Sequence, residues 1–292
     1  MKRLIVNADD FGLTAGVNRA IVELHRQLAL TSATLMAVAQ ATRQAADIAH
    51  QTPSLGVGCH VVLVDGEPVL PPAQLPTLVD QATGRFRPTL GKFVQDLFLN
   101  RIRPSEIEAE ASAQIARLRS LGLSLTHVDT HKHTHMFPRV LAPLLRAAGN
   151  QGIHAIRNPF EASWSLAATP GAPFLRRTQV HILNRFQPTF RKLVAQAQLA
   201  TTDGAVGVLA TGTLDARTLH SLLQALPNGT WELVTHPGYN DADLANARTR
   251  LLSARETERE ALQSLSANAE LQLIHFGQLH SELNSHLNSS IS

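Results

Sequence analysis

Short apolar runs alternate along the chain with longer stretches whose apolar residues recur every three to four positions. The runs are typical of buried strands and the periodic stretches of amphipathic helices. Strands are predicted at 3–8, 33–39, 55–64, 154–157, 205–210, 231–235 and 271–275, and helices at 15–28, 41–50, 104–121, 138–148 and 254–265. Apolar strands that alternate with helices indicate a parallel sheet covered by helices.

About seven or eight such strands in one chain predict an α/β fold of the irregular (β/α) TIM-like barrel type. Residues 65–90 are rich in proline and glycine and are predicted to form a long loop. Residues 280–292 are rich in serine and asparagine, which predicts a flexible tail. We therefore expect one barrel domain over residues 1–279.

A run from His127 to His135 places four histidines and Asp129 at every second position. If this run is an extended strand, all five side chains point to one face. Same-face neighbours lie about 6.6 Å apart, whereas a metal–nitrogen bond is about 2.0–2.1 Å long. One ion can therefore take about two of these groups, and the others must support the site, face a substrate or be structural. The alternative is a polar strand end with surface histidines.

Two other segments offer further metal ligands. The first strand runs into Asp9 and Asp10, and adjacent carboxylates suit two tasks, one as a ligand and one as a free base. The alternative is a turn in which both aspartates cap backbone amides. His60 lies inside an apolar run, where a lone histidine is more often a core residue, but the other segments need a third partner.

Three more residues are candidates: His236 just past a predicted strand, Arg157 in a predicted strand and Arg255 in a predicted helix. His236 precedes Pro237, which favours an extended and stiff backbone, as suits a general acid, although a solvated turn histidine is the alternative. Arg157 and Arg255 are weaker candidates for orienting a carboxylate or binding substrate, and the alternative for both is a surface ion pair. Reactive groups of barrels collect at the carboxyl ends of the strands, so we expect these segments to meet at one rim.

Composition narrows the class of protein. A net charge of +3 and 4% aromatic residues argue against a nucleic-acid partner. The single cysteine, Cys59, excludes an intrachain disulfide. No apolar stretch reaches the length of about 18 residues needed to span a membrane, and no signal-peptide pattern is present. We therefore expect a cytoplasmic protein.

Residues 162–202 contain no acidic residue but are rich in basic and aromatic ones. These are Arg176, Arg177, Arg185, Arg191, Lys192, Trp164, Phe174, Phe186 and Phe190. Such a surface suits peripheral contact with an anionic inner membrane leaflet. The alternative is a lid that covers the barrel and packs its aromatic side chains inward.

The motifs together resemble the YdjC-like carbohydrate deacetylases, which include chitooligosaccharide deacetylases. The resemblance covers nearly the whole chain, through Asn7-Ala8-Asp9-Asp10-Phe11-Gly12, Gly58-Cys59-His60, His127-Val128-Asp129-Thr130-His131, His236-Pro237 and Arg255-Glu256-Thr257-Glu258. It implies an irregular α/β barrel with one divalent metal ion held by Asp10, His60 and His131. It also implies that Asp9 is the general base and His236 the general acid. The residues expected to support this site or bind substrate are Asp129, His127, His133, Arg157 and Arg255.

Three further features resemble the hopanoid-biosynthesis-associated branch of this family: the stretch from His60 to Pro72, Gly84-Arg85-Phe86-Arg87, and Lys132. This resemblance implies removal of the acetyl group from an N-acetylglucosaminyl hopanoid. Cys59 stands where the family more often has an aliphatic residue. The alternatives are a deacetylase of soluble chitooligosaccharides or another amino sugar, a metal phosphoesterase, and a non-catalytic metal or lipid carrier.

The ligand types leave the metal open. Two histidines and one carboxylate suit Zn²⁺, Co²⁺, Fe²⁺ and Ni²⁺, and Mg²⁺ less well. We expect Zn²⁺ or Mg²⁺ first. The oligomeric state stays open, with a homodimer as one alternative.

Overall fold

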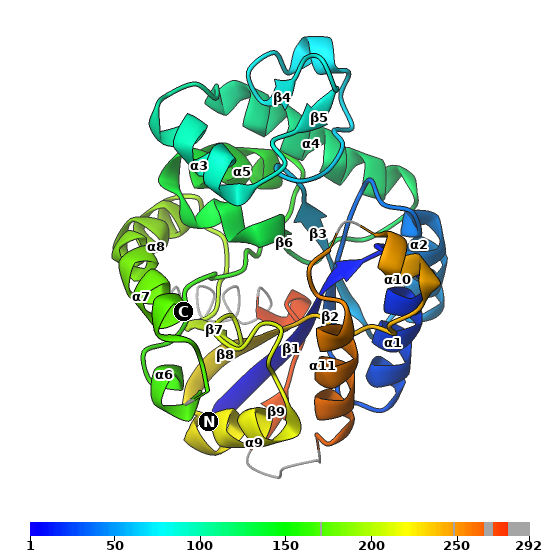
Figure 1. Cartoon of the computed structure of the whole chain (residues 1–292), viewed down its shortest axis with the longest axis vertical. Helices are drawn as coiled ribbons and strands as arrows, with labels where there is room; N and C mark the ends of the chain where they lie inside the picture. Colours follow the sequence, from blue (N-terminus) through cyan, green and yellow to red (C-terminus); the bar gives the residue numbers. More distant parts are fainter. Residues whose placement is uncertain (170, 248, 266–270, 280–292) are drawn as a thin grey trace, which may run out of the picture.

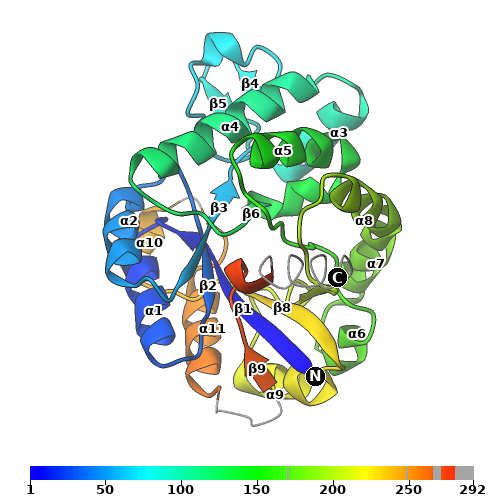
Figure 2. The same cartoon turned by 180° about the vertical axis from the view of Figure 1, so that it is seen from behind.

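The computed structural model describes residues 1–169, 171–247, 249–265 and 271–279. A curled parallel sheet occupies the centre, and helices surround it (Figures 1 and 2). The predicted irregular α/β barrel is therefore confirmed. The predicted tail, residues 280–292, lies outside the described residues.

The sheet is built from short parallel strands in the order β6-β3-β2-β1-β8-β7, and β9 also pairs with β1. Their bounds are β1 (Lys2–Phe11), β2 (Ser32–Leu35), β3 (Gly56–Val61), β6 (Val128–Thr130), β7 (Gly204–Val206), β8 (Gly229–Thr235) and β9 (Leu271–Leu273). On one edge, the first half of β1 pairs with β9 and the second half with β2. All of these strands run in one direction, so their carboxyl ends share one rim.

The barrel is irregular on the side between β6 and β7. A strand was predicted at residues 154–157, but this segment joins its neighbours only through single bridges, Val128 to Ile156 and Ala155 to Ala200. A third bridge joins Glu161 to Ala205 on β7. The chain there is extended but too irregular to form a continuous ladder, so the barrel closes through isolated contacts.

Helices pack around the outside of the sheet. They are α1 (Ala15–Arg26), α2 (Thr42–Gln51), α4 (Pro104–Ser120), α5 (Pro138–Asn150), α9 (Ala216–Ala225), α10 (Ala242–Asn246) and α11 (Ser253–Gln263). Thr14 and Asp215 begin α1 and α9, since their side chains accept the N–H groups of Val17 and Thr218. The predicted helices at 15–28, 41–50, 104–121, 138–148 and 254–265 are confirmed to within a few residues, whereas α9 and α10 were not predicted.

The predicted loop at 65–90 is more ordered than its composition indicates. It contains a 3-10 turn η1 (Pro72–Gln74) and a two-stranded hairpin, β4 (Val79–Asp80) with β5 (Arg85–Phe86), followed by an unpredicted helix α3 (Leu90–Phe98). Two buried acids of α4 hold this segment: Glu110 accepts the N–H groups of Val69 and Leu70, and Glu106 accepts those of residues 77 and 78. Side chains distant in sequence thus replace a local hydrogen-bond pattern.

Residues 162–202 form a helical layer beside the barrel. It comprises α6 (Ser165–Ala168), α7 (Phe174–Leu183), η3 (Asn184–Phe186) and α8 (Gln187–Gln196). Phe190 is fully buried and Trp164 packs edge-on against Trp231, whereas Phe174 is 84% exposed. The layer therefore packs some of its aromatic side chains inward, as the lid interpretation expects, and leaves others in solvent.

Candidate metal centre

The first strand places two neighbouring aspartates in the interior by breaking its own regularity. Its register against β2 shifts between Ala8 and Phe11, and Asp10 has a left-handed backbone with φ of 62°. A regular strand would turn Asp9 and Asp10 to opposite faces. Because of the irregularity, both carboxylates are buried, at 3% and 4% exposure, and lie at the carboxyl rim.

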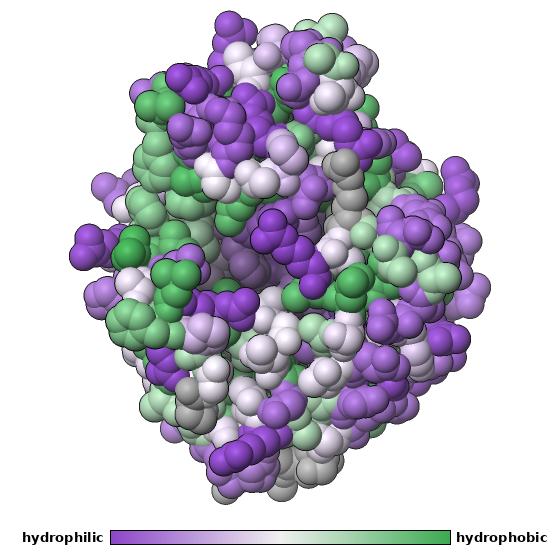
Figure 3. Space-filling model, viewed as in Figure 1, coloured by the Kyte–Doolittle hydropathy of each residue, from purple (hydrophilic) through white to green (hydrophobic). Residues whose placement is uncertain are grey.

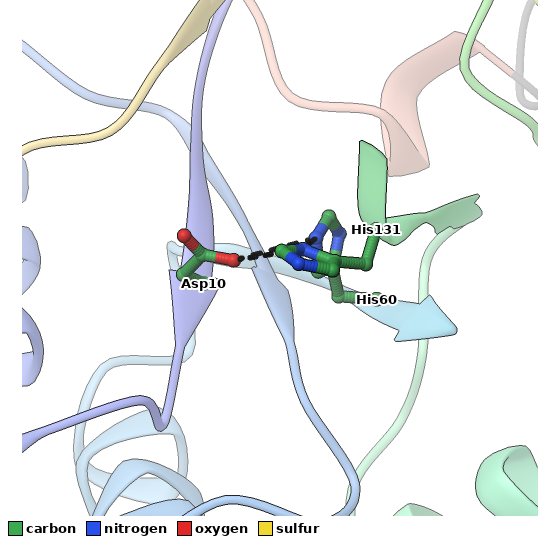
Figure 4. Close-up of side chains that lie close together, drawn as sticks. All are labelled: Asp10, His60 and His131. Carbon is green, nitrogen blue, oxygen red and sulfur yellow. Dashed lines mark hydrogen bonds and ion pairs between the residues drawn. The ribbon is translucent and has the colours of Figure 1, made fainter. Parts of the chain in front are cut away.

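Asp10, His60 and His131 converge from β1, β3 and the residue after β6 (Figure 4). Their ligand atoms form a nearly equilateral triangle: Asp10 Oδ1 lies 3.5 Å from His60 Nε2 and 3.4 Å from His131 Nδ1, and the two nitrogens are 3.3 Å apart. Tetrahedral ligands about 2.0–2.1 Å from a metal are separated by about 3.4 Å. Asp10 Oδ1 is buried without a hydrogen-bond partner in the described structure. The three residues therefore fit one divalent ion.

Asp129 orients His60. The two residues are paired in register on β3 and β6, and His60 Nδ1 lies 2.8 Å from Asp129 Oδ1. A carboxylate that accepts one imidazole N–H leaves the other nitrogen free to bind a metal. Burial lowers the pKa of His60, but Asp129 and the other carboxylates outweigh it and raise the pKa to about 9. The surroundings therefore favour positive charge here.

The prediction that the histidine run is extended was wrong beyond Thr130. The chain turns there into a 3-10 segment, η2 (His131–Met136), with Lys132 and His133 in left-handed conformations at φ of 56° and 52°. These turns destroy the alternation of side chains. His135 points into the core, where its Nδ1 lies 2.7 Å from Thr130 Oγ1.

His127 and His133 lie apart from the ligand triangle. His127 is fully buried and stacks on Phe276 at 3.9 Å, and Gly58 makes room for its ring, since a Cβ there would lie 2.5 Å from it. Burial lowers the pKa of His127 well below its usual range, and its ring is packed in the core. His133 is half-buried, and its Nδ1 is without a hydrogen-bond partner in the described structure.

Arg157 binds three carboxylates in the interior. It is fully buried and donates to Asp9 at 2.6 and 3.0 Å, to Glu232 at 2.8 Å and, through Nη1, to Asp129. Burial raises the pKa of Asp9, but Arg157, His60 and His236 outweigh it and hold the pKa far below its usual range. Asp9 is therefore ionised in the resting site. Glu232 was missed in the sequence, although an acid inside the apolar run of β8 could have indicated it.

His236 and Arg255 complete the site from two other elements. His236 directly follows β8, with its Nε2 3.7 Å from Asp9 Oδ2. Arg255, in the first turn of α11, donates to Asp10 Oδ2. Glu258 on the same helix accepts the backbone N–H of His236 at 2.6 Å, a contact that was not predicted from the sequence.

The buried arginines at the rim face more carboxylates than they neutralise by themselves. Arg157 and Arg255 face Asp9, Asp10, Asp129 and Glu232. The nearby carboxylates raise the pKa of His60, and burial raises that of Glu232 to about 7, so bound protons supply part of the balancing charge. A divalent cation among Asp10, His60 and His131 would take the place of such protons, since buried charges need partners.

Comparison with known proteins places this arrangement in a family. Residues 3–272 match the family described as YdjC-like protein. The chain belongs to the YdjC-like family. The resemblance seen in the sequence motifs is confirmed at this level.

Two relatives of this YdjC-like protein match nearly its full length, and a third matches about half of it. A carbohydrate deacetylase from Brevibacillus brevis is 33% identical over 95% of this chain and 99% of its own. One from Thermoanaerobacter pseudethanolicus is 30% identical over 90% and 91%. A chitooligosaccharide deacetylase from Salmonella paratyphi B is 38% identical over 51% and 57%.

Solved structures agree on the fold of this YdjC-like protein. A candidate cellobiose-phosphate cleavage protein from Enterococcus faecalis superposes with a TM-score of 0.75 at 24% identity, covering 95% of this chain and 98% of its own. A lactam utilization protein from Thermus thermophilus has a TM-score of 0.50 at 14% identity, covering 94% and 99%.

Proposed function

We propose that this protein is a metal-dependent deacetylase that hydrolyses the acetamide of an N-acetylglucosaminyl hopanoid to acetate and the free amine. The observation that carries the proposal is the ligand triangle of Asp10, His60 and His131 with Asp9 and His236 beside it. The full-length relatives confirm the predicted enzyme class, a hydrolase acting on N-acetyl amide bonds. The metal dependence and the lipid substrate are part of the proposal.

The side chains of the chain divide the work of amide hydrolysis. Asp10, His60 and His131 would hold one divalent ion, which supplies Lewis-acid chemistry to the acetyl group and to water. Asp9 accepts a proton from the attacking water, and Arg157 fixes the direction in which its carboxylate points.

His236 acts at the other end of the scissile bond. An amine leaves poorly as an anion, so its nitrogen must receive a proton as the carbon–nitrogen bond breaks. His236 lies beside Asp9 at the rim and delivers that proton from Nε2. In this proposal Asp9 serves the carbon of the amide bond and His236 serves its nitrogen.

An exposed apolar surface at the end of α3 supports a substrate with a large apolar part. Phe98 and Leu99, at the end of α3, are 57% and 52% exposed. The ring of Phe98 packs against Phe137 and Phe186 at 5.8 and 6.5 Å, and Phe137 follows the ligand His131 by six residues. Figure 3 shows hydrophobic side chains beside the hollow in this face, over α3 and α8. The ring system of a hopanoid suits such a surface.

Exposed apolar residues on α7 support contact with a lipid surface. Phe174, Leu175 and Ile182 are 84%, 68% and 50% exposed. By contrast, two of the basic side chains bind backbone carbonyls of their own chain. Arg176 donates to the carbonyls of residues 209 and 211, and Arg177 donates to those of residues 166, 169 and 172. Membrane contact in this proposal therefore depends on the apolar residues more than on the basic ones. Within the described part of the chain, none of the helices could cross a membrane.

A second candidate is a deacetylase of soluble chitooligosaccharides. It is favoured by a relative named chitooligosaccharide deacetylase, which matches 51% of this chain. Such a substrate is polar throughout and does not use the apolar surface around Phe98.

The deciding experiment is mass spectrometry of two substrates incubated with the purified protein, with and without a chelator. The substrates are N-acetylglucosaminyl bacteriohopanetetrol and N,N′-diacetylchitobiose. We expect a chelator-sensitive loss of one acetyl group from the hopanoid, faster than from the disaccharide. Turnover of the disaccharide alone would support the second candidate. Turnover that a chelator does not reduce would contradict the proposed dependence on a metal ion.

The apolar surface is tested by Phe98→Ser with Leu99→Ser. The rate on the lipid should fall by about 10-fold, since two exposed apolar side chains contribute on the order of 1–3 kcal/mol to binding, while the rate on the disaccharide should not change. Leu28→Ser is the matched control, because Leu28 is 77% exposed and lies outside both α3 and α7. A loss on both substrates would contradict the role of this surface.

A further inference from the structure

One face of α11 carries two buried charged side chains that both reach the site. Arg255 and Glu258 are each 1% exposed and lie three residues apart, which places them on the same side of the helix. Charged residues are almost never fully buried unless they are paired. Arg255 is paired with Asp10, whereas Glu258 faces His236.

Glu258 contacts His236 in two ways. Its Oε2 accepts the backbone N–H of His236 at 2.6 Å and lies 3.7 Å from Nδ1 of the same residue. Its Oε1 accepts the N–H of Gly212 at 2.8 Å. His236 Nδ1 is buried and has no hydrogen-bond partner in the described structure. The nearest acceptor for a proton on Nδ1 is therefore Glu258.

We propose that Glu258 is a positioning residue that holds His236 as an imidazolium with Nε2–H directed toward Asp9 and the departing amine. This inference rests on the proposed deacetylation. A protonated imidazole donates from both nitrogens, and here each nitrogen faces one carboxylate, Glu258 at Nδ1 and Asp9 at Nε2, both at 3.7 Å.

The charges around His236 agree with this role. Burial lowers its pKa, but Glu258 from α11 and Asp9 and Asp10 from β1 outweigh burial and raise the pKa above its usual value. In hydrolysis, water adds its oxygen to the acetyl carbon and the carbon–nitrogen bond breaks. The amine nitrogen takes the proton of Nε2, and the proton that Asp9 received from water restores the imidazolium.

The competing explanation is that Glu258 only anchors backbone, since it binds two N–H groups. Glu161 provides a matched control for this explanation. It is also buried, at 2% exposure, and its Oε2 accepts the N–H of Leu209 at 2.8 Å, in the same loop that Glu258 binds at Gly212. Its hydrogen bonds join it to residues outside the ligand triangle and His236.

The test compares Glu258→Gln and Glu161→Gln on two substrates. The first is an N-acetyl amino sugar, whose amine must be protonated to leave. The second is 4-nitrophenyl acetate, whose phenolate leaves without a proton. For Glu258→Gln we expect kcat to fall by about 10²-fold on the amide and by less than about 3-fold on the ester. Glu161→Gln should change both rates by one common factor.

The pH profile of the amide reaction adds a second measurement. Without the Glu258 carboxylate, His236 loses its proton at lower pH, so the basic limb of the kcat profile in Glu258→Gln should move to lower pH. Glu258→Asp, which keeps a carboxylate, should recover most of the amide rate. Equal losses on amide and ester, or an unmoved basic limb, would overturn the inference.

Nitrogen NMR of the wild-type imidazole keeps the inference testable even if the variants fail to fold. Both nitrogens of His236 should be protonated at neutral pH, and a neutral ring would overturn the proposal. A wild-type protein that hydrolyses the ester but no N-acetyl sugar would instead contradict the proposed function itself.

Discussion

Asp9 and Asp10 are neighbours in sequence but have different partners. Asp9 is bound by Arg157, and Asp10 by Arg255 and the two histidine ligands. The irregularity in β1 lets both carboxylates stay inside while pointing to different neighbours. Each can therefore be replaced with a distinct consequence.

Asp10→Ala should lose the metal, whereas Asp9→Asn should keep it and lose turnover by about 10²-fold or more. The reason is that Asp10 supplies one of three ligand atoms and Asp9 supplies none. Metal content per chain and the deacetylation rate are measured on the same preparations. Asp80→Asn, in an exposed turn, is the control. A near-normal rate for Asp9→Asn would show that the base lies elsewhere.

At the scale of residues, the sequence predicts the reactive groups better than the groups that support them. Asp9, Asp10, His60 and His236 stand out because polar side chains end or interrupt apolar runs. Glu258 does not, because an acid in a polar helix resembles any surface residue. The Asp129 contact with His60 depends on the register between β3 and β6, which no local pattern contains.

At the scale of elements, Glu161 links the start of the 162–202 layer to the loop after β7. It accepts from the Ser165 hydroxyl and from the N–H of Leu209. Burial raises its pKa to about 7 despite these hydrogen bonds. The folded protein therefore keeps a proton on this carboxyl over a pH range in which the unfolded chain has released it.

The free energy of unfolding should accordingly fall as the pH rises from about 4.5 to about 7, with Glu161 contributing up to about 3 kcal/mol. The sign follows because the folded state binds more protons than the unfolded state in this interval. Urea unfolding of the wild type and Glu161→Gln at several pH values measures the difference. Glu260→Gln, on the surface of α11, is the control. If the free energy of unfolding depends on pH equally in the wild type and in Glu161→Gln, Glu161 is not the group responsible.

Long periodic helices could be predicted, but elements held by distant side chains could not. The helix predicted over residues 104–121 agrees with α4 to within one residue. The segment before the hairpin at 79–86 is held by Glu106 and Glu110 of α4, and the strand predicted at 154–157 is reduced to single backbone bridges. Their order depends on tertiary contacts that propensity does not report.

At the scale of the whole molecule, the metal should act as a stabilising ligand. The ligand triangle joins β1, β3 and the end of β6, so it exists only in the folded barrel. An ion at 100 times its dissociation constant stabilises the folded state by about 2.7 kcal/mol, or roughly 5 °C in Tm. Calorimetry measures the Tm of the metal-loaded protein, of the chelated protein and of the protein after the metal is added back. An equal shift in Asp10→Ala would place the effect at another site.

The pairing of β1 also determines when the barrel can form. Its partner β8 begins at Gly229 and β9 at Leu271, and the Thr235 hydroxyl donates to the carbonyl of Asn7 across 228 positions. At a synthesis rate of about 5–20 residues per second, this strand waits roughly 10–40 s on the ribosome for those neighbours. During that interval the edge of β1 that faces β8 is unpaired, so the nascent chain is expected to expose an apolar strand edge that is open to aggregation.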